Sequence, residues 1–186
     1  YNFIMKLKII TLLIWSNFAY AEELLTNNSF LTANHIEYHN EISMISAIGE
    51  VEIINGTQVL RADKIIYDSL NNSILAEGNV SLSDNKDNIF FSESMELTGD
   101  FKKGVIKNFH SILNDGSSLS ANIIIRDTVN GDKLEKVIYT RCKPCEDDIN
   151  KAPIWQIRAL KSKRNIEDGI IEYENVIFDV YDIPIL

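Results

Sequence analysis

The sequence contains a repeat of about 29 residues, which limits the chain to folds built from similar units stacked side by side. Corresponding segments follow one another in steps of 29, 30 and 29 residues, and a fifth follows after a longer interval. They are Leu31-Thr32-Ala33, Leu60-Arg61-Ala62, Phe90-Phe91-Ser92, Leu119-Ser120-Ala121 and Ile157-Arg158-Ala159. A fixed period of this kind predicts one supersecondary unit per repeat, each packing on its neighbours.

The first half of each unit alternates between apolar and polar residues, which is typical of a β-strand. The alternation slips by one residue at the same place in successive units, as between Ala62 and Ile65 and between Ser92 and Met95. A β-bulge produces such a slip, because one extra residue bends the strand and redirects the side chains that follow. We therefore expect each of these strands to bend at a corner and pass from one sheet to another.

The second half of each unit alternates again and predicts the returning strand of an antiparallel hairpin. Turn-forming residues lie between the halves, as at Asp68-Ser69-Leu70-Asn71-Asn72, and between the units, as at Asn55-Gly56. The fourth unit places Lys133 and Glu135 in the inward register, so we expect the repeat to loosen toward its end. The apolar positions expected to face inward are Ile45, Ala47, Val51, Ile53, Ile74, Ala76, Val80, Leu82, Ile106 and Ile112.

No stretch of ten or more residues combines the 3.6-residue apolar period of a helix with a capping signal. The chain has 186 residues, of which 45% are hydrophobic and 9% aromatic, and this suits one globular domain with a core. The sequence predicts an all-β jelly roll or flattened β-sandwich, made of repeated antiparallel hairpins with bent strands and open edges. A β-solenoid is the alternative, although it would favour a shorter repeat with more glycine.

Residues 5–21 have the pattern of a secretory signal peptide. Lys6 and Lys8 precede the apolar run Ile9–Trp15, and Ala19-Tyr20-Ala21 matches a cleavage site. The run is too short for a membrane-spanning helix, which needs roughly 20 residues. After cleavage the chain would keep 16 of its 18 basic residues against 27 acidic ones, a formal net charge of −11. This charge argues against nucleic acid as a partner.

Cys142 and Cys145 lie in the insertion before the fifth unit, in a Cys-Lys-Pro-Cys segment. A thioredoxin-like redox role is disfavoured, because acidic residues rather than an apolar helix follow the pair. A zinc site with His35 and His39 is disfavoured as well, because an exported protein favours disulfides over metal thiolates. The two cysteines either bond to each other or pair with cysteines outside this sequence. We see no carboxylate pair, nucleophile triad or phosphate loop, and expect no catalysis, metal or cofactor.

The second unit resembles the repeat of the OstA-like lipopolysaccharide-transport proteins, A-D-x-x-x-Y-D followed by A-x-G-N-V. It reads Leu60-Arg61-Ala62-Asp63-Lys64-Ile65-Ile66-Tyr67-Asp68 and then Ile74-Leu75-Ala76-Glu77-Gly78-Asn79-Val80. LptA, LptC and the periplasmic domain of LptD share this repeat. The resemblance implies an OstA/LptA-like jelly roll whose inward positions line a groove for acyl chains, whereas a generic β protein would have a closed core there.

The segments after the fourth unit narrow the resemblance to the LptD branch of this family. They follow the order of the region that joins the periplasmic jelly roll to the outer-membrane β-barrel. The resemblance covers about residues 29–186 and implies an OstA-like domain at 29–148, then a last hairpin and a connection at 149–186 toward a missing barrel. The matching segments are Tyr139-Thr140-Arg141-Cys142-Lys143-Pro144-Cys145, Pro153-Ile154-Trp155-Gln156-Ile157-Arg158-Ala159, Asn175-Val176-Ile177-Phe178 and Ile183-Pro184.

The resemblance implies a role in lipopolysaccharide transport and assembly at the outer membrane of a Gram-negative cell. The jelly roll would receive the acyl chains of lipid A from an LptA-like jelly roll through edge-strand pairing. It would pass them to the barrel, which holds an LptE-like lipoprotein. In the family, cysteines of the N-terminal half bond to barrel cysteines, which implies such partners for Cys142 and Cys145. The full-length protein would lie in the cell outer membrane, with this part on its periplasmic face.

The net negative charge is consistent with a groove that holds acyl chains and leaves phosphorylated head groups in water. Two alternatives stay open at this point. One is an LptA- or LptC-like periplasmic bridge subunit, and the other is a β-solenoid scaffold that binds no lipid.

Overall fold

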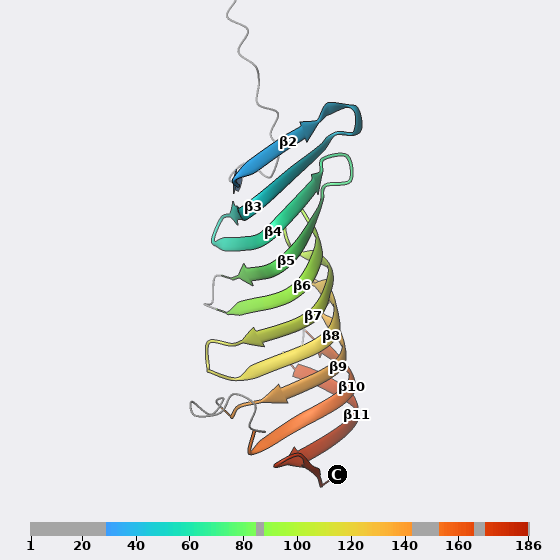
Figure 1. Ribbon diagram of the computed structural model, residues 1–186. Helices are drawn as coiled ribbons and strands as arrows, with labels where there is room; N and C mark the ends of the chain where they lie inside the picture. Colours follow the sequence, from blue (N-terminus) through green and yellow to red (C-terminus); the bar gives the residue numbers. More distant parts are fainter. Residues whose placement is uncertain (1–28, 85–87, 143–152, 166–169, 186) are drawn as a thin grey trace, which may run out of the picture.

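The computed structural model describes residues 29–84, 88–142, 153–165 and 170–185, which form one antiparallel sheet (Figure 1). The expected signal peptide at 5–21 lies outside these residues. The elements are β1 (Ser29–Thr32), β2 (His35–His39), the 3₁₀ helix η1 (Asn40–Ile42), β3 (Met44–Asn55), β4 (Gln58–Asp68), β5 (Ser73–Ser83), β6 (Ile89–Thr98), β7 (Lys103–Ile112), β8 (Ser118–Asp127), β9 (Lys133–Thr140), β10 (Trp155–Asn165), β11 (Ile170–Val180) and β12 (Ile183–Pro184).

Each strand from β3 to β11 pairs with the next one along the chain, and β1 and β2 both pair with β3. The predicted hairpins are therefore confirmed, as is the all-β jelly roll of antiparallel hairpins with bent strands and open edges. The β-solenoid alternative is wrong, because neighbouring strands run antiparallel throughout the described sheet. Strand β10 pairs with β9 across the cysteine insertion, so the sheet is continuous there. The division into domains at residue 148 stays a prediction.

The sheet bends across every long strand, and Figure 1 shows the strands sweeping round one side so that their halves lie in front and behind. The two halves are called arm 1 and arm 2. Their inward side chains form one buried core. Arm 1 contains the described parts of 29–32, 51–62, 80–92, 109–121, 137–159 and 176–184, and arm 2 contains those of 35–48, 64–77, 94–107, 123–135 and 161–174.

The corner between the arms is built from residues with left-handed backbone. In β3, Gly49 and Glu50 have φ of 80° and 49°, and in β5 the corresponding Gly78 and Asn79 have 74° and 46°. The register shifts beside each pair, as a bulge requires. The slip predicted between Ala62 and Ile65 therefore marks a corner of β4. The extra residue of each bulge, however, belongs to the neighbouring strand, β3 or β5.

Later corners use one left-handed residue each, namely Asn108 in β7, Lys136 in β9 and Asn175 in β11. The β6–β7 pairing shows no register shift, because both strands leave two residues unpaired at the same level. The predicted slip between Ser92 and Met95 therefore lies beside a bulge on its β5 side only. A left-handed backbone turns the strand equally well whether or not an extra residue accompanies it.

In the second and third units, a side chain on the first strand accepts a hydrogen bond from a left-handed corner residue. Asn79 Nδ2 donates to Asp63 Oδ2 at 2.8 Å, and Asn108 Nδ2 donates to the Glu93 carboxylate. A Cβ atom on Gly78 would lie 2.5 Å from Asp63 Oδ2 and 3.0 Å from Asp63 Cβ. Glycine is required at Gly78 because the backbone is left-handed and the Asp63 side chain occupies the space.

The turns of arm 2 repeat one arrangement as well. Asp127 accepts hydrogen bonds from the backbone N–H of Val129 and Asn130 and from Asn130 Nδ2, at 3.0, 2.9 and 2.8 Å. Asp68 makes the same three kinds of contact at the turn between β4 and β5, two arm 2 turns earlier. These bonds favour the ionised carboxylate and lower the pKa of Asp127 to about 2.

The last hairpin carries a paired carboxylate on its outer face. Arg158 Nε and Nη2 donate to the Asp179 oxygens at 2.5 and 2.9 Å, and Gln156 Nε2 adds a bond of 3.0 Å. The Asp179 side chain is 1% exposed. Hydrogen bonding to Arg158 lowers the pKa of Asp179 and outweighs its burial, so β10 and β11 are joined by a charged as well as a backbone contact.

Replacing Gly78 with alanine should destabilise the protein by about 2 kcal/mol, because left-handed backbone and the Asp63 contact are both unfavourable for a Cβ atom. Gly56→Ala is the matched control, since Gly56 has φ of 60° but nothing within 4 Å of the added Cβ. That variant should lose only about 1 kcal/mol. Urea unfolding measures both, and equal losses would show that the Asp63 contact is unimportant.

Replacing Asp127 with asparagine should lower the free energy of unfolding at neutral pH. The pKa of Asp127 is lowered in the folded state, so its contribution is present above the unfolded pKa near 4 and is lost as the pH falls toward 2. The difference between variant and wild type should therefore shrink between pH 4 and pH 2. Unfolding curves at several pH values test this, with the exposed Glu135→Gln as a control for net charge. A difference independent of pH contradicts the assignment.

Candidate functional site

The inner face of the folded sheet is the main apolar surface of the described chain. Nine of the ten side chains predicted to face inward are no more than 5% exposed. They pack against residues of the opposite arm and of neighbouring strands, such as Leu60, Met95 and Leu97. The nine are Ile45, Ala47, Val51, Ile53, Ile74, Ala76, Val80, Leu82 and Ile106. Their inward position is as expected, whereas contact with lipid stays a prediction.

The tenth, Ile112, was wrongly placed on the inner face. Its side chain is 49% exposed, and Phe109 and Ser111 take the buried positions of β7 instead. Asn108 is left-handed, and the inward positions therefore step by three residues from Ile106 to Phe109. The same three-residue step is visible in the first strand of the units, and it was the signal that could have corrected the assignment.

The fourth unit differs from expectation for the same reason. Lys133 and Glu135 are exposed, and Leu134 and Val137 are the buried residues of β9. The step of three again crosses a left-handed residue, here Lys136. The inner face therefore stays apolar through β9, and the repeat loosens less than the alternation suggested.

Both ends of the inner face are open to solvent. At the N-terminal end, Ile36 and Tyr38 of β2 pair with the buried Ala47 and Ile45, yet they are 48% and 50% exposed. Cross-strand partners share a face of the sheet, so these side chains continue the inner surface. Beyond them, no further described strand covers the edge.

The C-terminal end repeats this arrangement. Val176 of β11 pairs with the buried Ala159 and is 46% exposed, and Ile171, opposite Arg164, is 53% exposed. Apolar inward side chains exposed at both ends mark places where another sheet or a ligand could extend the core.

One row of inward-facing cross-strand partners changes from apolar to charged along the sheet. Near the turns of arm 2 it holds Tyr67, Ile74 and Leu97 in the N-terminal half, and all three are buried. Further along, the same row holds Arg126 and Arg164, with Asp132 between them. Charged side chains at strand ends resemble turn residues in a sequence, so sequence reasoning did not single out these arginines.

Two contacts bridge the free ends of the arms, along a line called the seam. Asn55 of arm 1 donates through Nδ2 to the carbonyl oxygen of Gly99 on arm 2 at 3.2 Å. The Arg126 guanidinium of arm 2 lies 5.9 Å from the ring centroid of Phe90 on arm 1. The seam is therefore held in part by single polar contacts rather than by a strand ladder.

Cys142 sits at the end of β9 and is partly exposed. Its N–H donates to Thr140 Oγ1 at 3.0 Å, and Thr140 Oγ1 donates to the Trp155 carbonyl at 2.7 Å. The Trp155 ring lies 6.0 Å from that of Phe178, centroid to centroid. Cys145 lies outside the described residues, and the disulfide that either cysteine forms stays a prediction.

The two histidines considered for zinc lie on the edge strand β2 and share a carboxylate. His35 Nε2 is 2.9 Å and His39 Nε2 is 3.6 Å from the oxygens of Glu37, and all three side chains are exposed. Within the described ranges, no three His, Cys, Asp or Glu side chains are arranged to hold a metal ion. The described residues also include no helix long and apolar enough to cross a membrane.

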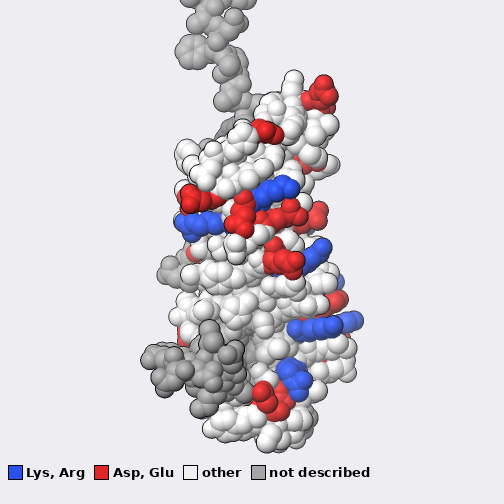
Figure 2. Space-filling view, viewed as in Figure 1, with Lys and Arg blue, Asp and Glu red and all other residues white. Residues whose placement is uncertain are grey.

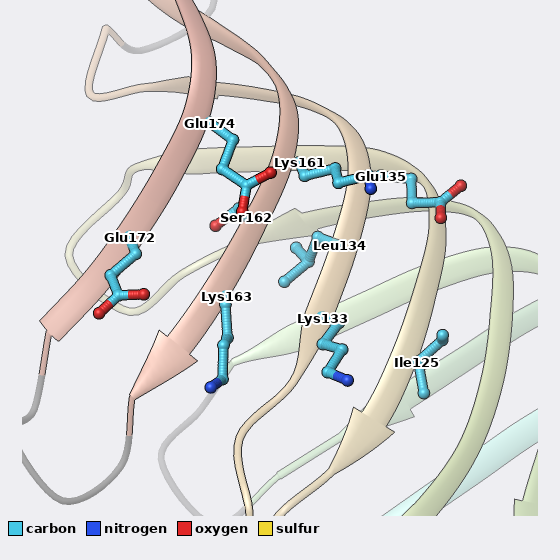
Figure 3. Close-up of a pocket in the computed structure, with 9 residues that line it drawn as sticks. All are labelled: Ile125, Lys133, Leu134, Glu135, Lys161, Ser162, Lys163, Glu172 and Glu174. Carbon is cyan, nitrogen blue, oxygen red and sulfur yellow. The ribbon is translucent and has the colours of Figure 1, made fainter.

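A hollow of about 260 Å³ lies on the outer face over β8 to β11 (Figure 3). It is lined mainly by lysine and glutamate side chains of neighbouring strands, so it is unsuited to acyl chains. Figure 2 likewise shows both signs of charge interspersed on the face that it presents. The lining residues are Ile125, Lys133, Leu134, Glu135, Lys161, Ser162, Lys163, Glu172 and Glu174.

No family model matches the chain. The LPS-assembly protein LptD of Nitrosomonas europaea is 28% identical over 160 residues, which are 84% of this chain and 21% of that protein. LptD of Nitrosospira multiformis is 28% identical over 143 residues, 76% of this chain and 15% of that protein.

Among solved structures, LptH, the LptA homologous periplasmic component of the lipopolysaccharide transport device of Pseudomonas aeruginosa, aligns with a TM-score of 0.48. The identity is 14%, over 54% of this chain and 76% of that one. The chain spans about a fifth or less of the length of the curated relatives it matches. These sequence matches confirm the resemblance inferred from the repeat and the cysteine segment: over most of its length, the chain is similar to LPS-assembly proteins LptD.

Proposed function

We propose that this chain acts in lipopolysaccharide transport and assembly at the outer membrane, as the periplasmic jelly roll of an LptD-type protein. The similarity to LptD over most of the chain supports the class of protein. The observation that carries the mechanism is the inner face, whose buried side chains from β3 to β10 are mainly apolar and which ends in the exposed Ile36 and Val176.

Physical chemistry explains why such a face suits a lipid carrier. Each methylene group exposed to water costs about 0.8 kcal/mol, so a ten-carbon stretch costs roughly 8 kcal/mol. Acyl chains of lipid A therefore need an apolar path between membranes. A folded sheet with apolar ends can take chains at one end and release them at the other without exposing them to solvent.

The arms must separate for chains to enter. Inner residues such as Ala47, Ile74 and Leu82 are fully buried against their neighbours, so the face is a packed core in this conformation. Acyl chains would replace contacts between the arms with similar apolar contacts. The polar bridge from Asn55 to Gly99 would break as the seam opens.

The edges of the sheet suit extension by another sheet. Strand β2 pairs only with β3 among the described strands, so it forms an edge at which another strand can pair. An LptA-like jelly roll pairing there would bring its inner face into line with Ile36 and Tyr38. The opposite end would lead to a β-barrel with an LptE-like lipoprotein, in the cell outer membrane.

Cys142 and Cys145 would then anchor the jelly roll by disulfides, either to cysteines of the barrel or to each other. Cys142 lies at an arm 1 turn, and its Sγ is 3.8 Å from the backbone carbonyl oxygen of Trp155. A partly exposed thiol at a turn is accessible to a partner cysteine without unfolding the sheet.

A scaffold that binds no lipid is the second candidate, and the tight packing of the inner face favours it. The two candidates differ at the open ends. A scaffold would use Ile36 and Val176 only to contact other protein, whereas a carrier would expose them to acyl chains. An LptA- or LptC-like bridge subunit would share the carrier behaviour and differ in having no barrel.

Site-specific photocrosslinking in cells distinguishes carrier from scaffold. A photoreactive residue at Ile36 or Val176 should form adducts with lipopolysaccharide, because both side chains continue the inner face. The matched control is Ile112, which is equally exposed at 49% but lies on the outer face. Adducts at the two inward positions and none at Ile112 are expected. Absence of adducts at every inward position, or equal labelling at Ile112, would exclude the carrier role.

A further inference from the structure

The inner face contains one charged row, and its position is unusual for a packed β core. Arg126 lies opposite Gly104, and Arg164 lies opposite Ile171, both on the side of the sheet that carries the buried Ile124 and Ser162. Asp132 is between them. The row itself carries two positive charges and one negative charge, and Asp84 adds a second carboxylate near Arg126. It lies at the seam, in the C-terminal half of arm 2.

Arg126 is incompletely paired within the described structure. Its Nε donates to the Phe101 carbonyl oxygen at 2.8 Å, and its guanidinium faces the Phe90 ring. Burial is the main cause that lowers the pKa of Arg126, although the group stays charged as arginines do. Asp132 and Asp84 also act on its charge and raise its pKa, so the guanidinium has carboxylate neighbours besides the carbonyl and the ring. A phosphoryl group would compete with these carboxylates for the guanidinium donors that Phe101 does not take.

Arg164 also has a donor atom without an acceptor among the described residues. Its Nη2 lies 3.1 Å from Asp132 Oδ2, whereas its Nε is buried and has no hydrogen-bond partner among the described residues. Asp132 cannot supply the missing acceptor freely, because its other oxygen already accepts from the backbone N–H of Asp127 at 2.9 Å. A buried donor without an acceptor is unfavourable, and an incoming anion would supply the missing acceptor.

We propose that Arg126 and Arg164 bind a phosphoryl group of the lipid head group at the seam, while the acyl chains lie along the inner face. This inference rests on the proposed function. Guanidinium groups hold phosphate oxygens through paired N–H donors, which lysine cannot reproduce. Paired guanidinium donors at this row would therefore give the head group a defined position on the inner face.

Binding at this row would also act on the seam. The Arg126 guanidinium contacts Phe90 across the two arms, and a phosphoryl group would compete for the same guanidinium. Losing the Phe90 contact would loosen the seam where the acyl chains have to enter. Head-group recognition and opening of the arms would thus be coupled through one side chain.

The test uses the full chain and three ligands: lipid A with both phosphates, lipid A with the phosphates removed, and inorganic phosphate. The two lipids are presented in the same detergent micelles, and affinities are measured by thermophoresis. Arg126→Gln and Arg164→Gln should each weaken binding of the phosphorylated lipid at least tenfold and change binding of the dephosphorylated lipid less than twofold. Arg126→Lys should fall between wild type and Arg126→Gln.

Arg61→Gln is the matched control, because Arg61 is an exposed arginine that pairs with Glu52 on the outer face. It should change neither lipid affinity. Unchanged binding of the dephosphorylated lipid shows that each variant is folded, and Arg164→Gln provides a second test if Arg126→Gln unfolds.

The outcomes separate the inference from the function on which it rests. Equal affinity of the two lipids for wild type overturns head-group recognition and leaves acyl-chain binding by wild type intact. Loss of affinity for both lipids in an arginine variant that circular dichroism shows to be folded also overturns head-group recognition. Inorganic phosphate that binds as tightly as the phosphorylated lipid, with the same dependence on the arginines, overturns it in favour of a free-phosphate site. Failure of both lipids to bind wild type overturns the proposed function together with the inference.

Discussion

A single antiparallel sheet can bury one of its own faces only by folding back on itself, and every long strand must then bend at the same level. In this protein that level is fixed by left-handed residues: two in each of the first corners and one in each later corner. If one strand bent elsewhere, its inward residues beyond the bend would point to solvent, because side chains alternate along a strand. The apolar inner face, its open ends and the charged row all follow from the alignment of these corners.

The inner face has two properties that differ in origin. Its burial comes from contacts within this chain, as for Leu60 and Ile65, and supports the fold. Its exposed ends come from the absence of a further described strand beyond β2 and the limited pairing of β11 with β12. The residues that stabilise the fold therefore lie in the middle of the inner face, and those that can contact a ligand or another protein lie at its ends. The middle can stay packed while the ends make such contacts.

Much of this architecture was predictable because the repeat copies the corner into each unit. The slip at Ala62 located the bend, and alternation around Gly49 and Gly78 identified the inward side of β3 and β5. Ile112 was misassigned because Asn108 turns the backbone without the glycine that marks the earlier corners. The pairing of Arg126 with Phe90 was not predictable, since it joins the two arms and depends on how closely they approach.

The corners also determine where the chain can vary in length. A residue inserted or deleted at Gly78 or Asn108 would turn the inward side chains of half a strand to the outer face. A residue added at a turn changes only a loop outside the paired strands. The connections fit this expectation: only Gly56 and Thr57 separate β3 from β4, while β9 and β10 pair in full register although residues 141–154 separate them. In this fold, the tolerance for insertion thus lies at the tips of the arms, and a new segment can be acquired there without disturbing the core.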